Sequence, residues 1–81
     1  MKKMKRKYNY RKLIGRIIEK FGTRRAFAKA CGFSENTISK KLSGKMAITT
    51  DDINDWSSAD LLDIDSSEFP EYFFDYEVQA N

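Results

Sequence analysis

Apolar residues recur at helical spacing in the first third of the chain. They occupy positions i, i+3, i+4, i+7, i+8 and i+11, namely Tyr10, Leu13, Ile14, Ile17, Ile18 and Phe21. This period lines one face of a helix with apolar side chains, which a folded domain buries against other elements. The pattern predicts a helix that begins at Asn9 as its N-cap and ends at Phe21, just before Gly22.

A second, shorter helix is predicted over residues 24–31. Thr23 can serve as its N-cap, because a threonine hydroxyl accepts a hydrogen bond from a free backbone N–H in the first turn. Gly32 follows the helix, and glycine adopts the left-handed conformation of a helix end at little cost. Cys31 is expected to be a small buried residue of this helix.

A third helix is predicted over residues 35–43, with Ser34 as its N-cap and Gly44 as its end. Ile38 and Leu42 stand four residues apart and give it a narrow apolar stripe. The other side chains form a polar face, made of Glu35, Asn36, Ser39, Lys40 and Ser43.

The pattern weakens after residue 45. A loop is expected over residues 45–49, followed by a helix that Thr50 caps and whose Ile53 and Trp56 face the core. Residues 70–81 allow two interpretations: Tyr72 and Phe73 suit a short last helix, whereas the apolar residues after them alternate as in a strand. Both interpretations give an all-α domain, a compact bundle of four to five helices around a central helix-turn-helix.

The chain length of 81 residues is enough for one domain with one modest core. Residues 1–8 carry five basic residues without apolar periodicity, and we expect a flexible basic arm there. The helical domain is predicted over residues 9–76 and a C-terminal tail over residues 77–81.

Opposite charges are concentrated in opposite halves of the chain. All 15 Lys and Arg residues lie in residues 1–45, where Glu19 and Glu35 are the only acids, so this part has a formal charge of +13. Residues 46–81 hold ten acids and no Lys or Arg, which gives −10. Such an asymmetry is typical of a protein with one half that binds a polyanion and another that faces away from it.

Two helices joined by a short turn containing glycine are typical of the helix-turn-helix unit, whose second helix fits the major groove of DNA. The segment resembles that of the lambda-repressor-like family of phage repressors and Cro proteins. The matching residues are Ala28, Gly32, Phe33, Ser34, Ile38 and Ser39, together with the downstream stretches DINDW, LLDID and EYFF. The resemblance covers about residues 9 to 76. Lys41 departs from it, because the family usually has an apolar residue there; Leu42 is expected to fill the core instead.

The resemblance implies a transcriptional repressor of a phage or prophage switch, with a Cro-like role, that binds double-stranded DNA at a pseudo-palindromic operator. Asn pairs with adenine, Lys with guanine and Glu with cytosine in the major groove, so the residues predicted to contact bases are Glu35, Asn36, Ser39 and Lys40. Those predicted to contact phosphates are Arg24, Arg25, Ser34, Thr37, Lys41, Lys45, Lys5, Arg6 and Lys7.

A homodimer is expected at least on DNA, because two half-sites need two copies of the recognition helix. The aromatic residues Tyr72, Phe73, Phe74 and Tyr76 either form the dimer contact or cover the core of their own protomer. An alternative function is a protein-interaction module, such as an antirepressor or antitoxin, that uses the acidic and aromatic C-terminal half.

An enzyme is poorly supported, because the chain has no histidine, no glycine-rich phosphate loop and no nucleophile beside a base. One cysteine and no histidine exclude a zinc site of the usual kind, and no cofactor or small-molecule ligand is expected. The basic N-terminal residues lack a following apolar stretch, so we expect no signal peptide and a cytoplasmic protein.

Overall fold

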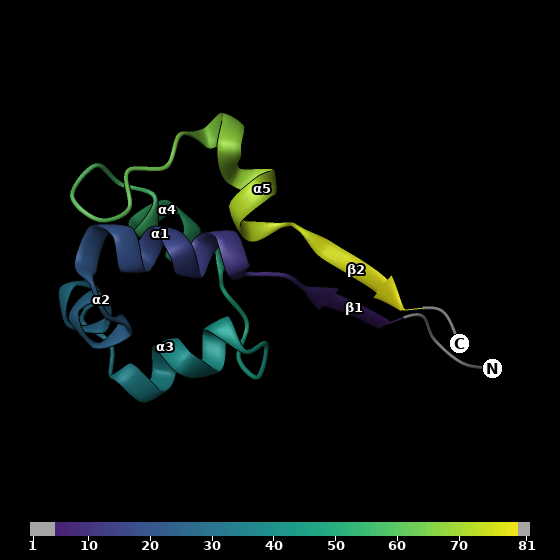
Figure 1. Cartoon of the computed structure of the whole chain (residues 1–81), viewed down its shortest axis with the longest axis horizontal. Coiled ribbons are helices and arrows are strands. Elements are labelled where there is room, and N and C mark those ends of the chain that lie inside the picture. The colour runs from purple at the N-terminus through teal and green to yellow at the C-terminus, as the bar shows by residue number, and fades with distance from the viewer. Residues whose placement is uncertain (1–4, 80–81) are drawn as a thin grey trace.

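Helices enclose one apolar core, and segments near the two ends of the chain pair as a β-ribbon that projects from the helices (Figure 1). The computed structural model describes residues 5–79, with the side chains of residues 8–75. The elements are β1 (Lys5–Tyr8), α1 (Arg11–Phe21), α2 (Arg24–Cys31), α3 (Glu35–Leu42), α4 (Thr50–Trp56), the 3-10 helix η1 (Ser66–Glu68), α5 (Phe69–Phe73) and β2 (Tyr76–Gln79). The all-α domain predicted from the sequence is confirmed, and the ribbon is added to it.

The core takes side chains from all five α-helices and from the segment before η1. Its fully buried members include Leu13 and Ile17 of α1, Ile38 of α3 and Leu62. At its centre the ring of Phe27 meets that of Trp56 edge to face, with 5.2 Å between ring centroids. This is the geometry that the charge distribution of aromatic rings favours.

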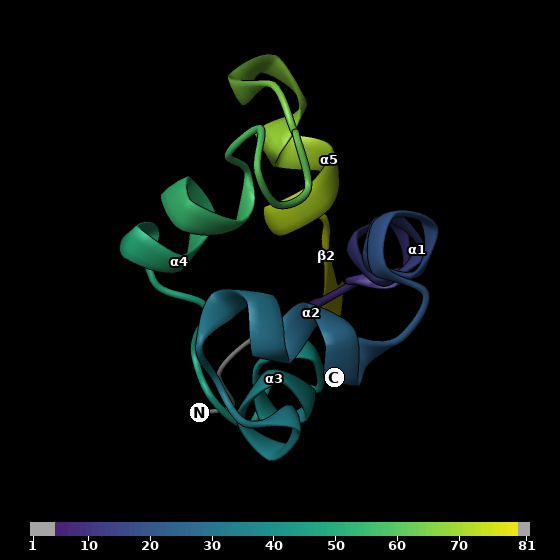
Figure 2. The same cartoon turned by 90° about the vertical axis from the view of Figure 1, so that its left-hand side faces the viewer.

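Outside the ribbon, in which β1 pairs with β2, the helices α2 and α3 of the basic half lie on a different side of the molecule from the acidic segment that ends in α5 (Figures 1 and 2). In Figures 1 and 2, α2 and α3 form the lower side, whereas α5 and the chain that leads into it form the upper side. Helix α1 connects the two sides through its own basic residues. Arg16 donates from Nε to the carbonyl oxygen of Leu62 at 2.9 Å and from a terminal nitrogen to that of Asp63 at 2.8 Å, and Lys12 pairs with Glu71.

Four helix starts were predicted from capping residues, and two of these helices begin elsewhere. Helix α1 begins at Arg11, with Tyr10 at the N-cap position, although the Asn9 side chain does accept from the Arg11 N–H. Helix α4 is capped by Thr49, which forms a reciprocal capping box with Asp52, and Thr50 is its first helical residue. A capping box satisfies two free N–H groups where a single cap satisfies one, which favours Thr49.

The basic segment at the N-terminal side is not a free arm over the residues that the structure describes. Lys5–Tyr8 forms β1, which pairs antiparallel with β2, so that Tyr8 lies opposite Tyr76. The prediction of a flexible arm is therefore wrong for Lys5–Tyr8, and residues 1–4 lie outside the described residues. The alternatives for residues 70–81 are resolved as both: α5 is followed by β2, and residues 80–81 lie outside the described part.

Some large apolar residues are exposed, including one from the predicted apolar face of α1. Ile18 is 45% exposed, because a helix turns by about 100° per residue and α1 directs Leu13 and Ile17 inward. Phe33 in the turn before α3 is 36% exposed, and Met46 in the loop after α3 is 39% exposed. None of the helices within residues 5–79 is long and apolar enough to cross a membrane.

Candidate nucleic-acid interface

Helices α2 and α3 form the predicted helix-turn-helix. Thr23 caps α2 as expected, its hydroxyl accepting from the Ala26 N–H at 3.0 Å. Gly32 ends α2 in the left-handed conformation, with φ 79° and ψ 21°, and the next N–H, that of Phe33, bonds the Ala28 carbonyl at 2.9 Å. Ala28 is buried where α2 packs on α3, and its small side chain lets the two helices approach closely.

The start of α3 is fixed by Ser34. Its hydroxyl oxygen accepts from the Thr37 N–H at 3.1 Å and its O–H donates to the Thr37 hydroxyl at 3.0 Å. Ile38 and Leu42 are buried, as their spacing predicted. The helix ends at Leu42, one residue before the predicted end, with Ser43 at the C-cap position.

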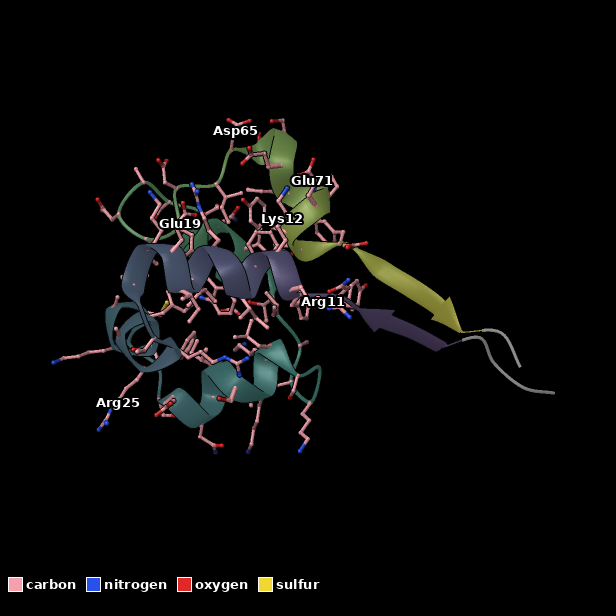
Figure 3. The ribbon with its side chains drawn as sticks, in the orientation of Figure 1. Arg11, Lys12, Glu19, Arg25, Asp65 and Glu71 are labelled. Carbon is pink, nitrogen blue, oxygen red and sulfur yellow. The ribbon has the colours of Figure 1, made fainter. Side chains whose placement is uncertain are left out.

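The polar face of α3 is open to solvent. Glu35, Asn36 and Lys40, three of the four residues predicted to contact bases, are exposed, and the fourth, Ser39, is half-buried. Side chains of α3 extend downward from the ribbon in Figure 3, away from the core. The structure thus brings these four residues together on one accessible helix.

The residues predicted to contact phosphates are placed less uniformly. Arg25 is exposed and extends away from α2 in Figure 3, while Arg24 is half-buried and Lys45 is exposed. Ser34 and Thr37 flank the same surface, although their hydroxyls already bond each other. Lys5, Arg6 and Lys7 belong to β1, and their side chains lie outside what the structure describes.

Lys41 does not contact phosphate in the way that the sequence predicted. The residue is 6% exposed, and its Nζ donates to Asp52 Oδ2 at 2.6 Å and to the Ala47 carbonyl at 3.0 Å. The prediction fails because α4 places a carboxylate beneath α3. Lys41 occupies the position where an apolar residue was expected, and it is a core residue with a partner.

Asp52 is the residue of this region that sequence reasoning missed as a partner of α3. Burial works to raise the pKa of its carboxyl, but the Lys41 ammonium and the N–H and hydroxyl of Thr49 outweigh it, and the pKa lies below the ordinary value of 3.8. The sequence signal was the pair Thr49 and Asp52 at capping-box spacing. The contact with Lys41 had no local signal, because the two residues are brought together by the fold.

The Lys41–Asp52 pair makes stability depend on pH. Because the pKa of Asp52 is lower in the folded state, its contribution is present above about pH 4 and is lost as the pH falls through the folded-state pKa. We expect the free energy of unfolding, measured in urea from pH 6 to pH 2, to fall less for Asp52→Asn than for wild type. Asp51→Asn is the control, since Asp51 is the exposed neighbour of Asp52 on α4 and takes no part in the pair with Lys41. Equal pH slopes for wild type and Asp52→Asn would contradict the assignment.

Cys31 is half-buried at the end of α2. Burial, with the charges of Asp52 and Asp55, raises the pKa of its thiol to about 11. The thiol is therefore protonated at neutral pH, which is the state of a structural cysteine and not of a nucleophile. This agrees with the packing role expected from the sequence.

Two hollows flank the helix-turn-helix. The larger, of about 630 Å³, lies between the end of α3, the loop after it and the base of the ribbon, where Tyr8, Met46 and Phe74 are exposed. The smaller, of about 380 Å³, lies between α2 and α4 and is lined by apolar residues, with Asp55 and Asp60 among its other lining residues.

The sequence of residues 6–76 matches the profile of a family described as "Protein of unknown function (DUF739)". The chain belongs to the DUF739 family. The match runs from the second residue of β1 to the first residue of β2 and so includes every helix described above.

The fold of this DUF739 protein is similar to the solution structure of the modulator of repression (MOR) of the temperate bacteriophage TP901-1 from Lactococcus lactis. The TM-score is 0.72 and the sequence identity 40%, over 83% of this chain and 88% of that one. No curated protein matches the chain significantly.

Proposed function

We propose that the protein is a sequence-specific DNA-binding regulator that reads an operator through α3. The observation that carries the proposal is the exposed polar face of α3, held on a helix-turn-helix with Arg25 and Lys45 beside it. A major groove admits one α-helix, and side chains on the outer face of that helix reach base edges.

The side chains of α3 match the chemistry of base edges. Asn36 can bond adenine N6 and N7 as a pair, and Lys40 can donate to guanine O6 and N7. Glu35 can accept from the amino group of cytosine, and Ser39 can bond either kind of group. Glu35 also lies in the first turn of α3, where its charge is compatible with the helix dipole.

The residues proposed to contact the DNA phosphates lie on the same side of the molecule as the polar face of α3. Arg24 and Arg25 begin α2, where free N–H groups favour a phosphate, and Lys45 follows α3. The basic residues of α1 contribute less to phosphate binding. Lys12 is paired with Glu71, and Arg16 donates to a backbone carbonyl of the acidic half. The charge available to DNA is therefore smaller than the +13 of residues 1–45.

The regulatory setting follows from the structural relative. The similar phage protein is described as a modulator of repression of a temperate bacteriophage. We assign the chain to the same kind of genetic switch, of a phage or prophage, and to a Cro-like repressor role within the lambda-repressor-like family. It would act by covering an operator that overlaps a promoter, so that RNA polymerase is excluded.

A pseudo-palindromic operator requires two copies of α3, about one helical turn of DNA apart. Tyr72 and Phe73 cannot supply an open dimer contact, because both are buried in the core of their own protomer. Phe74 is exposed beside the ribbon, and the side chain of Tyr76 lies outside the described residues. A dimer on DNA would therefore use Phe74 and the ribbon.

The proposal is tested by a binding titration of wild type at several salt concentrations. The DNA beside the protein's own gene is compared with a scrambled duplex of equal length. We expect a preference of about 10³-fold or more for the native DNA at physiological salt. Equal, steeply salt-dependent binding to both duplexes would show phosphate contacts alone and would reject operator reading.

A second candidate function is modulation of a repressor protein by direct binding. The observation that favours it is the smaller hollow, where apolar Phe33, Trp56 and Leu61 stand beside the acidic Asp55 and Asp60. Such a surface suits a basic protein segment that carries an apolar side chain. The acidic and aromatic C-terminal half is the region expected from the sequence to bind a protein.

Calorimetric titration with a synthetic basic peptide that carries apolar side chains separates the two candidates. Binding that is lost in Asp55→Asn/Asp60→Asn and kept in Asn36→Ala/Lys40→Ala would favour the protein partner. No heat with the peptide, together with a preference for the native DNA, would favour operator reading.

A further inference from the structure

Lys41 connects the recognition helix with the chain on both sides of it. Its Nζ donates to Asp52 Oδ2 at 2.6 Å and to the Ala47 carbonyl at 3.0 Å, both beyond the end of α3. The same ammonium lies 5.4 Å from the ring centroid of Phe33, which precedes α3. One buried charge therefore contacts the turn before the helix, the loop after it and the start of α4.

The carboxylate that binds Lys41 is itself held in place. Asp52 Oδ2 also accepts from the Thr49 N–H at 3.0 Å, and the Thr49 hydroxyl accepts from the Asp52 N–H at 3.1 Å. Within residues 8–75, every fully buried side-chain nitrogen or oxygen has a hydrogen-bond partner. Lys41, Asp52 and Thr49 are thus joined in one hydrogen-bonded network, and such buried networks make the local structure rigid.

Stability alone does not account for a charge pair at this position. Removing two ions from water costs free energy that their attraction barely repays, and apolar side chains of similar volume are often as stabilising. What directional hydrogen bonds add is a fixed orientation. Here they define how α3 is rotated relative to α4, and with it the directions of Asn36 and Lys40.

We propose that Lys41 and Asp52 are positioning residues that set the orientation of α3 for reading DNA, without touching DNA themselves. The inference rests on the proposed function. It states that the Lys41–Asp52 pair controls how specifically the polar face of α3 recognises DNA. Lys41 acts through the helix and not through its charge on phosphate, as its burial requires.

Salt dependence distinguishes positioning from phosphate contact. The logarithm of the binding constant falls with the logarithm of the salt concentration. Each phosphate contact that is lost makes this negative slope shallower by about 0.9, whatever the DNA sequence. A lost orientation instead lowers the preference for the operator and leaves the slope unchanged. Lys45 provides the matched control, because it is an exposed lysine close to Lys41 in the chain.

The test uses the double variant Lys41→Met/Asp52→Leu, since a single substitution would leave one buried charge without its partner and could unfold the protein. The double variant is expected to stay folded, with the operator preference lowered by about tenfold or more and the salt slope unchanged. Lys45→Met is expected to keep the operator preference and to have a salt slope that is shallower by about 0.9. A double variant that keeps the wild-type preference would overturn the proposal, as would a reduced salt slope.

A measurement without DNA separates this inference from the proposed function. Residual dipolar couplings of the backbone amides give the orientation of α3 relative to α4 and α1 in the free protein. We expect the double variant to change that orientation and Lys45→Met to preserve it. If wild type shows no operator preference, the proposed function fails, and these couplings still decide the inference: an unchanged orientation in the double variant rejects it.

Discussion

Phe27→Ala is expected to remove a large part of the protein's free energy of unfolding. The ring of Phe27 is fully buried and lies between Phe21, at 5.4 Å, and Trp56, at 5.2 Å between centroids. Truncating a buried phenylalanine to alanine costs about 3–5 kcal/mol. A domain of 81 residues has a stability of roughly 4–12 kcal/mol, from about 0.05–0.15 kcal/mol per residue, so the loss removes a large part of it.

Urea unfolding, followed by circular dichroism and by the fluorescence of Trp56, measures this loss. Ile18→Ala is the control, because Ile18 is apolar, belongs to the predicted apolar face of α1 and is 45% exposed. We expect the control to lose about 1 kcal/mol or less. Similar losses in the two variants would mean that the core is not centred on Phe27 and Trp56.

The double variant Asn36→Ala/Lys40→Ala is expected to lose operator recognition while remaining folded. Both side chains are exposed on α3, so their removal leaves the core intact. A good bidentate contact contributes about 1–3 kcal/mol of discrimination, so two such contacts give about 2–6 kcal/mol, a factor of roughly 30 to 10⁴. Competition between native and scrambled duplexes measures the ratio directly.

A control with the same change of composition is available elsewhere on the surface. Lys20→Ala/Asn54→Ala removes one lysine and one asparagine that are exposed on α1 and α4. This control is expected to keep the operator preference, with at most a small change in overall affinity from the lost charge. If both double variants lose the preference equally, α3 has no special role in recognition.

Local signals in the sequence were sufficient for most of the helices. The spacing of Leu13 and Ile17 located α1, and the caps Thr23 and Ser34 located α2 and α3 to within a residue. These signals are local, because a cap or an apolar stripe acts within one helix. The end of the chain was different: β2 pairs with β1 across nearly the whole sequence, and no local pattern specifies such a partner.

The candidate site was predicted less evenly. The exposure of Asn36 and Lys40 follows from the positions of Ile38 and Leu42, since one buried stripe determines which side chains face outward. The role of Lys41 did not follow, because a lysine near DNA-reading residues is normally a surface charge. Only the position of α4 shows that a carboxylate, Asp52, lies within reach of it.

The contacts that the basic residues of α1 make with the acidic half also could not be predicted from local sequence. Arg16 contributes to the basic half in a charge count, yet the fold directs its guanidinium to the carbonyl groups of Leu62 and Asp63. Charge by sequence position therefore overstates the surface available to a polyanion. On the side formed by α2 and α3, Arg25, Lys29 and Lys40 are exposed, as Figure 3 shows for Arg25, whereas Lys41 is buried.

The most direct test of DNA reading by α3 is an NMR titration of the labelled protein with the DNA beside its own gene. The account predicts that the amide resonances of Glu35, Asn36 and Lys40 shift most. Resonances of the acidic side, such as those of Asp55 and Asp60, are expected to stay unchanged. Shifts that gather around Asp55 and Asp60 and spare α3, or that appear equally with scrambled DNA, would contradict it.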